Sequence, residues 1–262
     1  MNFRQYLLGL LTLTSLCTRQ FADASSFPKC KPGLPVATVC EQRLDALLPT
    51  QPDVGRYEVK IKQKKYSKLG ATDMEKLKVK KPAPVVIGPD GNYYLIDHHH
   101  TALALEESGQ TSMYVTIQED WSNVGSKKKP IENRMRTFWN KMKSHKFGYF
   151  RNAEGILVDP LSASFPKTFE DMGNNRLRSV VYLLIDKDVI EMSDVEAAEF
   201  GAAEILRKMH VEVKKGNYDE AVTEAAEKLL ARKVKIDARK AAHPGINCNR
   251  DAFKVIISPP QT

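Results

Sequence analysis

The sequence contains few cysteines and, beyond its first residues, no long hydrophobic run. Four cysteines in 262 residues are too few for a fold held together mainly by disulfides. No stretch after residue 24 approaches the roughly 20 apolar residues that a membrane-spanning helix needs. Internal repeats and low-complexity segments are lacking as well. We therefore expect a soluble globular chain, long enough for one hydrophobic core with a helical extension.

The first 24 residues have the pattern of a secretory signal peptide. Arg4 gives a positively charged start, Tyr6–Cys17 is apolar and rich in leucine, and Ala22 and Ala24 are small residues suited to a cleavage site. The apolar run is shorter than a membrane span. We predict a signal peptide over residues 1–24 and a secreted or periplasmic protein, with an uncleaved anchor as the alternative.

Three cysteines, Cys30, Cys40 and Cys248, remain after such a cleavage. An oxidising compartment favours a disulfide between two of them. Cys30 and Cys40 are nearest in sequence, whereas Cys248 would instead connect the C-terminal tail to the N-terminal segment. The sequence does not choose between these pairings, and the third thiol stays free or pairs outside the chain.

The net charge of +8 is concentrated in two lysine clusters. Nine lysines lie between residues 60 and 81, against only Asp73 and Glu75, and Lys127–Lys129 form the second cluster. Such clusters bind nucleic acid, anionic lipid or an acidic partner. The first cluster uses lysine without arginine, which favours the competing interpretation of a solvated face that keeps the protein soluble. Its members are Lys60, Lys62, Lys64, Lys65, Lys68, Lys76, Lys78, Lys80 and Lys81.

The first half of the sequence combines strand and helix signals. Arg56–Lys62 alternates like a strand, which would place Lys60 and Lys62 on one side. Thr72 and Glu75 have the spacing of a capping box, which predicts a short helix ending near Lys81. A compact module of strand, turn, strand, helix and strand follows: Val85–Ile87, Gly88–Gly91, Tyr93–Ile96, Thr101–Glu107 and Met113–Ile117.

The second half is predicted to be mainly helical. Ser193 and Glu196 form a second capping box, which opens a helix through about Val213. A strand-like run, Phe253–Ile257, lies in the tail. Apolar residues recur at helical spacing in three stripes, which we interpret as core packing: Ile131, Met135, Phe138, Trp139 and Met142; Leu177, Val180, Val181 and Leu184; and Tyr218, Ala221, Val222, Ala225 and Leu229.

Three consecutive histidines, His98–His100, lie directly after a predicted strand and before a predicted helix. The first amides of a helix lack partners within the helix, and the helix dipole makes that end favourable for anions. Imidazoles placed there donate to a phosphate or transfer protons, and the helix end lowers their pKa. Asp97 is a good N-cap, or it fixes the tautomer of an imidazole. The pattern predicts an anion site with acid–base chemistry, and a structural role of single rings is the alternative.

A metal site is another use of these histidines. His98 and His100 fall on one side if the chain is still extended there. A further ligand would have to come from elsewhere, such as His145 or His210, and neither lies at a recognisable ligand spacing. A nucleotide and a divalent metal are therefore both open as cofactors.

The run Asp97–His100, after Gly88–Ile96, resembles the Asp-x-His-His element of the putative ParB-like nuclease family in the ParB/sulfiredoxin superfamily. The resemblance extends over residues 44–245. Its further elements are Leu48–Gln51, Val54-Gly55, Glu58-Val59, Lys62, Arg178-Ser179, a helix with Glu199, Phe200, Ala202 and Arg207, and Pro244-Gly245. The Pro-Thr-Gln and His-His elements are fairly specific in combination.

The resemblance implies a small α/β domain in which a strand–helix turn cradles nucleotide phosphates. Related turns read Gly-Cys-His-Arg, Gly-Glu-Arg-Arg or Asp-Gly-His-His-Arg. Here His98 stands at the glycine position and Thr101 at the arginine position, and no cysteine for sulfinic-acid repair is present. The missing arginine removes a bidentate phosphate clamp, which Lys62 replaces in part as a point charge. Thr50 and Gln51 match positions expected near the pocket.

We predict an α+β fold with a ParB/sulfiredoxin-like mixed-sheet core at residues 44–125. An irregular lead-in at 25–43 precedes it, and a helical extension at 126–245 and a tail at 246–262 follow. The candidate catalytic residues are Asp97, His99 and His100, and the candidate phosphate-binding residues are Thr50, Gln51, Lys62, His98 and Thr101.

The expected chemistry is phosphodiester hydrolysis or phosphoryl transfer. Transfer from ATP fits the superfamily, but ATP is scarce outside the cytosol. A non-catalytic module that binds nucleic acid or another polyanion through its lysines is the alternative.

Overall fold

The computed structural model describes residues 27–125, 127–192, 198–214, 216–231 and 253–254. The predicted signal peptide, Cys248 and the capping box at Ser193 lie outside these residues.

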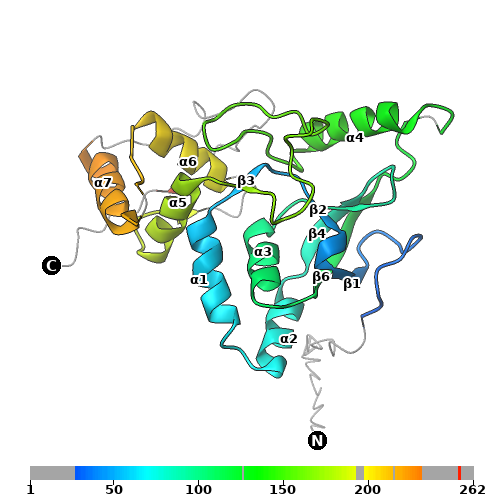
Figure 1. Ribbon diagram of the computed structural model, residues 1–262, viewed down its shortest axis with the longest axis horizontal. Coiled ribbons are helices and arrows are strands. Elements are labelled where there is room, and N and C mark those ends of the chain that lie inside the picture. Colours follow the sequence, from blue (N-terminus) through cyan, green and yellow to red (C-terminus); the bar gives the residue numbers. More distant parts are fainter. Residues whose placement is uncertain (1–26, 126, 193–197, 215, 232–252, 255–262) are drawn as a thin grey trace, which may run out of the picture.

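A five-stranded mixed sheet forms the centre of the first half of the molecule (Figure 1). The strand order is β1-β6-β4-β5-β2. The β1–β6 and β4–β5 pairs are antiparallel, whereas β4–β6 and β2–β5 are parallel. A short 3₁₀ turn at Leu44–Ala46 connects the first two strands. The strands are β1 (Val39–Arg43), β2 (Leu47–Pro49), β4 (Ala83–Ile87), β5 (Tyr93–Leu95) and β6 (Ser112–Asp120).

Helices cover both faces of this sheet. Neighbouring side chains of a strand point to opposite faces, so one strand contributes to two hydrophobic cores. Val85 packs in the core with helices α1 (Arg56–Tyr66), α2 (Ala71–Lys80) and α3 (His99–Glu107). Val86 lies in a second core with α4 (Ile131–His145). Of the stripe predicted on α4, Phe138, Trp139 and Met142 are buried, whereas Ile131 is 42% exposed.

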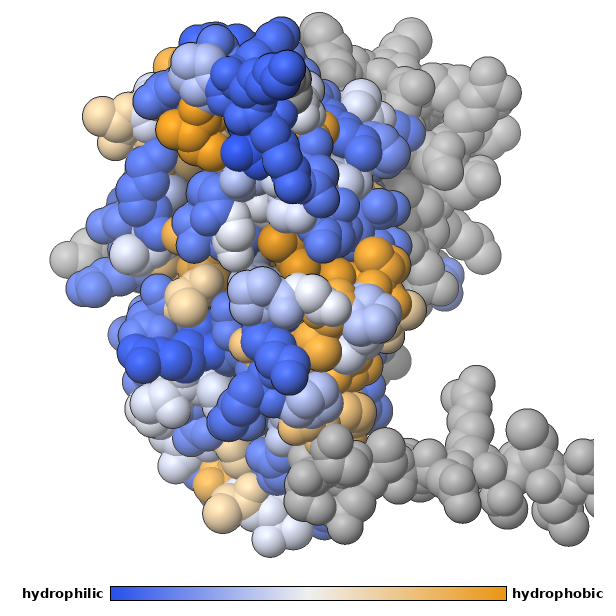
Figure 2. All heavy atoms as spheres, turned by 90° about the vertical axis from the view of Figure 1, so that its right-hand side faces the viewer, coloured by the Kyte–Doolittle hydropathy of each residue, from blue (hydrophilic) through white to orange (hydrophobic). Residues whose placement is uncertain are grey.

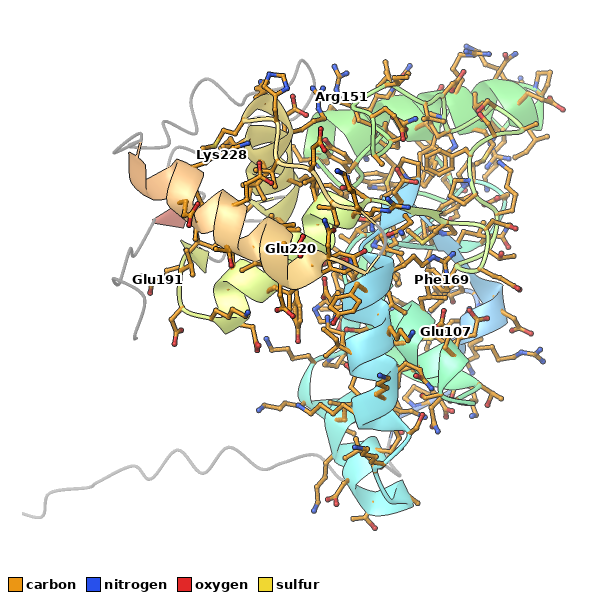
Figure 3. All side chains as sticks on the ribbon, turned by 60° about the vertical axis from the view of Figure 1, so that its left-hand side comes forward. Glu107, Arg151, Phe169, Glu191, Glu220 and Lys228 are labelled. Carbon is orange, nitrogen blue, oxygen red and sulfur yellow. A yellow bond between two sulfur atoms is a disulfide. The ribbon has the colours of Figure 1, made fainter. Side chains whose placement is uncertain are left out.

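The second half has a helical core of its own. Helices α5 (Arg176–Asp186), α6 (Ala198–Lys208) and α7 (Tyr218–Ala231) pack around apolar residues that include the predicted stripes. Figure 3 shows α7, which carries Glu220 and Lys228, crossing beside α1, and the rings of Tyr57 and Tyr218 stack there at 4.1 Å. The predicted helix after residue 196 ends at Lys208, earlier than expected.

Two small ladders complete the fold. β3 (Asp53–Val54) and β7 (Gly173–Asn174) pair in parallel and join the two halves. β8 (Glu191–Met192) pairs antiparallel with β9 (Phe253–Lys254), which is the described part of the strand predicted in the tail. The architecture is the predicted α+β class. Among the described residues, none of the helices has both the length and the apolar character needed to cross a membrane.

The strand predicted at Arg56–Lys62 is wrong, because this segment is the start of α1. The Lys62 ammonium pairs with the Glu58 carboxylate at 2.6 Å, an i,i+4 contact that only a helix provides. Lys60 and Lys62 consequently do not share a side: Lys60 is exposed and Lys62 is half-buried.

The capping box predicted at Thr72 is also wrong. Gly70 is the N-cap of α2, and its carbonyl accepts the first helical bond, from the Met74 amide. Thr72 therefore lies inside the first turn, and the Glu75 carboxylate accepts a hydrogen bond from the Tyr114 hydroxyl instead. The predicted end of this helix near Lys81 is confirmed.

Cys30 and Cys40 form a disulfide, with their Cα atoms 5.0 Å apart. It fastens the N-terminal lead-in to strand β1, and it is the pairing favoured by proximity in sequence. Figure 2 shows the face that forms the right-hand side of Figure 1, which is mostly hydrophilic with a hydrophobic patch near its centre and to the right. The large hydrophobic residues that are exposed within the described ranges are Val36, Tyr57, Ile131, Ile156, Leu157 and Leu161.

Candidate functional site

The histidine turn starts its helix two residues earlier than predicted, because α3 begins at His99. His98 is the N-cap and has a left-handed backbone, with φ 69° and ψ 22°. A side chain is strained in that region, which glycine adopts freely. Asp97 is not the N-cap: its carboxylate accepts a hydrogen bond from the His98 amide at 2.6 Å, and its side chain is 59% exposed.

His99 is buried, and its ring is hydrogen-bonded to the backbone. Its Nε2 accepts from the Thr50 amide at 3.1 Å, and the ring also bonds the Leu95 backbone. The Thr50 hydroxyl donates to the Leu95 carbonyl at 2.6 Å, and the Gln51 amide donates to the Asp53 carbonyl at 3.0 Å. Burial, and next the charge of a nearby arginine, lower the pKa of His99 to about 3. The neutral ring thus fixes the start of α3 against the end of β2.

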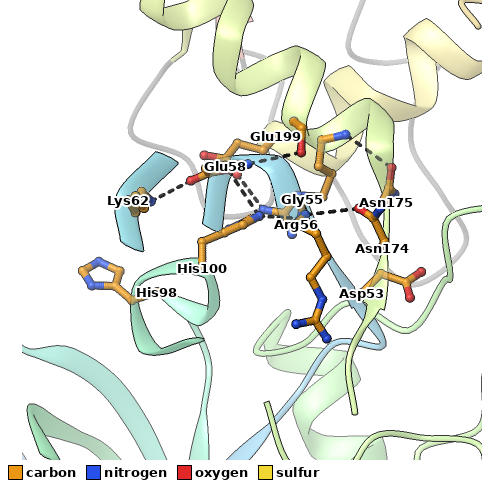
Figure 4. A network of polar contacts seen from close by, with 12 residues as sticks. Asp53, Gly55, Arg56, Glu58, Lys62, His98, His100, Asn174, Asn175 and Glu199 are labelled. Atoms are coloured by element: carbon orange, nitrogen blue, oxygen red, sulfur yellow. Dashed lines mark hydrogen bonds and ion pairs between the residues drawn. The ribbon is translucent and has the colours of Figure 1, made fainter. Parts of the chain in front are cut away.

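His100 lies beside the carboxylate of Glu58 (Figure 4). The Gly55 amide donates to His100 Nε2 at 2.8 Å, and Glu58 Oε2 lies 3.2 Å from the same nitrogen. Burial, followed by the charges of Arg178 and Lys62, holds the pKa of His100 well below its usual value. Since the ring is neutral and its lone pair is occupied by the Gly55 amide, it donates nothing to Glu58.

Glu58 is therefore a buried carboxylate with one partner. Its Oε1 pairs with the Lys62 ammonium at 2.6 Å, whereas its Oε2 has no hydrogen-bond partner within the described part of the chain. Burial raises the pKa of Glu58, and the charge of Lys62 offsets this only in part. Burial alone would lower the pKa of Lys62, but Glu58 outweighs it and the pKa is raised. Lys62 is thus a stable cation at neutral pH.

A second ion pair, between a buried arginine and a half-buried glutamate, adjoins the first. The Arg178 guanidinium, with a side chain only 5% exposed, donates through Nη2 to Glu199 Oε2 at 2.5 Å. Burial alone would raise the pKa of Glu199, but Arg178 outweighs it and the pKa is lowered. Glu58 and Glu199 are in this way each neutralised by one cation, Lys62 and Arg178.

The first turns of four helices bring these residues together. Each lies in the first turn of its helix: Glu58 in α1, His100 in α3, Arg178 in α5 and Glu199 in α6. The positive ends of four helix dipoles consequently converge, which favours an anion. We call Glu58, His100, Arg178 and Glu199, with Lys62 and His98 at their border, the four-helix site.

Close backbone contact holds two of these helices. A side chain on Gly55 would lie 2.7 Å from the Ser179 hydroxyl and 2.9 Å from the Ser179 amide, so only glycine fits at the start of α1. The α5 terminus is capped by Asn175, whose side-chain oxygen accepts from the Arg178 amide at 3.3 Å. The Val-Gly and Arg-Ser elements of the sequence thus meet in space.

Glu58, His100 and Glu199 also have the spacing of a metal-binding group. One potential ligand atom from each lies within 4.8 Å of the others. His100 Nε2 and one Glu199 oxygen already face the Gly55 amide and Arg178, so a divalent cation would compete with both of these donors, although Glu58 Oε2 has no partner among the described residues. We therefore derive no chemical step through a metal. The ligands predicted from the sequence are not assembled, because His145 packs against Trp121 instead, with ring centroids 5.0 Å apart.

The lysine cluster borders the site. Seven of its nine lysines are exposed on α1, on α2 and on the loops that follow them: Lys60, Lys64, Lys65, Lys68, Lys76, Lys80 and Lys81. Burial lowers the pKa of His98, Asp97 opposes this, and the positive charges of Lys62 and Lys81 lower it further. His98 is therefore in the electrostatic field of the lysine face.

The structure brings together some of the predicted site residues but not all. His98, His100 and Lys62 belong to the four-helix site, whereas Thr50 and Gln51 are buried behind His99. Thr101 is half-buried in α3. Glu58, Arg178 and Glu199 were not predicted as site residues, although each lies in a sequence element of the family resemblance. Those elements were the available signal.

Comparison with known proteins identifies a family and a solved structure to which the chain is similar. The family model described as Putative ParB-like nuclease matches residues 40–208. The chain is also similar to the crystal structure of protein Atu1540 from Agrobacterium tumefaciens, with 27% sequence identity and a TM-score of 0.61. That match covers 76% of this chain and 95% of the Atu1540 chain. No curated protein matches.

Proposed function

Because the chain belongs to the putative ParB-like nuclease family, we propose that it binds nucleic acid and hydrolyses a phosphodiester bond at the four-helix site. One observation carries the proposal: the Glu58 carboxyl group is buried and has a raised pKa, and its Oε2 atom has no hydrogen-bond donor among the described residues. A carboxylate in this state is a suitable general base.

Glu58 takes the proton of the attacking water. The water oxygen bonds to phosphorus, the bond from phosphorus to the leaving oxygen breaks, and the leaving oxygen takes a proton from solvent at the border of the site. Glu58 then returns its proton to solvent. Lys62 and His98, each with a side chain 25% exposed, lie where the phosphate oxygens arrive. The positive charge of Lys62 and the N–H donors of both side chains stabilise the charge that develops on phosphate.

The candidate residues of the histidine turn take different roles in this proposal. His100 borders Glu58 and excludes water from its inner side. His99 is a positioning residue, since its ring nitrogens bond Thr50 and the Leu95 backbone. Asp97 orients the turn through the His98 amide. Thr50 and Gln51 support the end of β2, and Thr101 directly follows His100 in the first turn of α3.

Export fits hydrolysis better than phosphoryl transfer. Hydrolysis consumes only water, whereas phosphoryl transfer needs a nucleotide that is scarce outside the cytosol. The Cys30–Cys40 disulfide is the kind of bond that persists in secreted and periplasmic proteins. We include secretion after cleavage at Ala24 in the proposal on these grounds.

The test compares Glu58→Gln with the unaltered chain from residue 25, using labelled DNA and RNA oligonucleotides with and without EDTA. Loss of a general base slows turnover roughly 10²–10⁴-fold, and chelation is expected to leave the rate unchanged. Glu132→Gln, on the exposed start of α4, is the matched control. Equal cleavage by Glu58→Gln would point to a contaminating nuclease and contradict the proposal.

A binding module without catalysis is the second candidate, supported by the seven exposed lysines. Replacing Lys64, Lys65 and Lys68 by glutamine removes three phosphate contacts and flattens the salt dependence of binding. If this triple variant loses affinity while no preparation cleaves an oligonucleotide, binding alone is the function.

A further inference from the structure

Arg178 is held rigidly in the interior of the protein. Its guanidinium carbon lies 3.8 Å from the centroid of the Phe200 ring, and Phe200 in turn stacks on Tyr149 at 3.8 Å. Its own amide is bound by the Asn175 cap. A buried arginine fixed on its face and at its backbone presents the edges of its guanidinium in one orientation.

Two nitrogens of this guanidinium have no acceptor among the described residues. Nη2 pairs with Glu199, whereas Nε and Nη1 are buried and have no hydrogen-bond partner in the described residues. Buried polar groups are nearly always satisfied, so an exception calls for an explanation. Guanidinium donors match the oxygens of carboxylate and phosphate groups, so an oxyanion suits these free donors.

The present partner of Arg178 is unusually accessible. The Glu199 side chain is 39% exposed, whereas that of Arg178 is 5% exposed. The carboxylate can therefore turn toward solvent, while the guanidinium cannot follow. Lys62, Arg178, Glu58 and Glu199 balance at two positive and two negative charges. An arriving phosphodiester monoanion that displaces the Glu199 carboxylate leaves this balance unchanged.

We propose that Arg178 is an oxyanion-binding residue of the four-helix site and that Glu199 occupies it as an internal competitor of phosphate. The ligand is a phosphate group, either the phosphodiester of a nucleic acid or free inorganic phosphate. Arg178 thereby takes the place of the arginine that is missing at Thr101. The proposal rests on the proposed function for the identity of the phosphodiester, but phosphate binding is measurable without turnover.

The test is titration of the full mature chain with inorganic phosphate and, separately, with a deoxyribodinucleotide, by calorimetry at constant ionic strength. Glu199→Gln keeps the shape of the side chain but removes its charge, and the affinity for phosphate should rise at least tenfold. Arg178→Lys should lose detectable binding. Glu224→Gln is the matched control, since Glu224 is 37% exposed and pairs with Lys228 on α7. It should leave the affinity unchanged.

Unchanged or weaker binding by Glu199→Gln would overturn the proposal, as would full affinity in a folded Arg178→Lys variant. Circular dichroism establishes whether Arg178→Lys is folded; if it is not, Glu199→Gln alone decides. A preference for the dinucleotide over inorganic phosphate identifies the phosphodiester as the ligand. Tighter binding by Glu199→Gln, combined with normal cleavage by Glu58→Gln, would keep the oxyanion site and reject the proposed hydrolysis.

Discussion

The left-handed backbone of His98 makes the effect of glycine on stability predictable in sign. With φ at 69°, a Cβ atom costs roughly 1–2 kcal/mol relative to the right-handed region. Glycine removes this strain but loses roughly 0.5–1 kcal/mol through the greater freedom of its unfolded chain. The His98→Gly variant should therefore be more stable than His98→Ala by roughly 0–1.5 kcal/mol, with about 0.75 kcal/mol from the centres of the two ranges. Both lack the imidazole, so the comparison isolates the backbone.

A neighbouring position supplies the control with the opposite sign. Thr101 lies within α3, where glycine is about 1 kcal/mol less favourable than alanine. The free energies of unfolding of His98→Gly, His98→Ala, Thr101→Gly and Thr101→Ala are measured by urea titration at pH 7. If alanine is as stable as glycine at position 98, the backbone there is not strained and the reasoning fails. A strained histidine at a position that suits glycine suggests that the ring is kept for function. Both His98 variants should then bind phosphate equally weakly.

Two further predictions concern stability. The pKa of His99 is about 3 in the folded chain and about 6.5 unfolded, so its contribution is present above pH 6.5 and is lost as the pH falls. Between pH 7 and 5 this loss is about 2 kcal/mol, and His99→Gln, titrated with urea at both values, should be spared it; an equal loss in both proteins contradicts the assignment. Replacing Cys30 and Cys40 by serine opens a loop with a sequence separation of 10 and should cost about 2–3 kcal/mol of unfolding free energy, measured in the same way. An unchanged midpoint would mean that the bond stabilises nothing.

Local patterns predicted the part of the site that is contiguous in sequence. The histidine turn was recognisable because a strand ends and a helix begins within a few residues around His98. The strand predicted at Arg56–Lys62 failed because alternation of Tyr57, Val59 and Ile61 fits either structure over so short a run. Packing of Val59 in the sheet core decided in favour of the helix.

The other half of the site was beyond local patterns. Arg178 lies in a helix whose apolar stripe was predicted correctly, and Glu199 lies in a helix that was predicted from a capping box, but neither pattern says which partner a helix end meets. Their positions depend on the contact between Gly55 and Ser179, which is a property of tertiary structure. Only the family resemblance, which contains both residues, linked them to the histidine turn.

The short parallel ladder between β3 and β7 determines when, during folding, the site becomes complete. Asp53 pairs with Gly173 across a long intervening stretch of chain, and a Cβ atom on Gly173 would lie 1.8 Å from the Asp53 carboxylate. Closing so long a loop is entropically costly and slow compared with forming the local strand–helix module. We therefore expect a nascent chain that has folded its sheet to carry the histidine turn before Arg178 and Glu199 join it. The four-helix site would then be complete only when the two halves join.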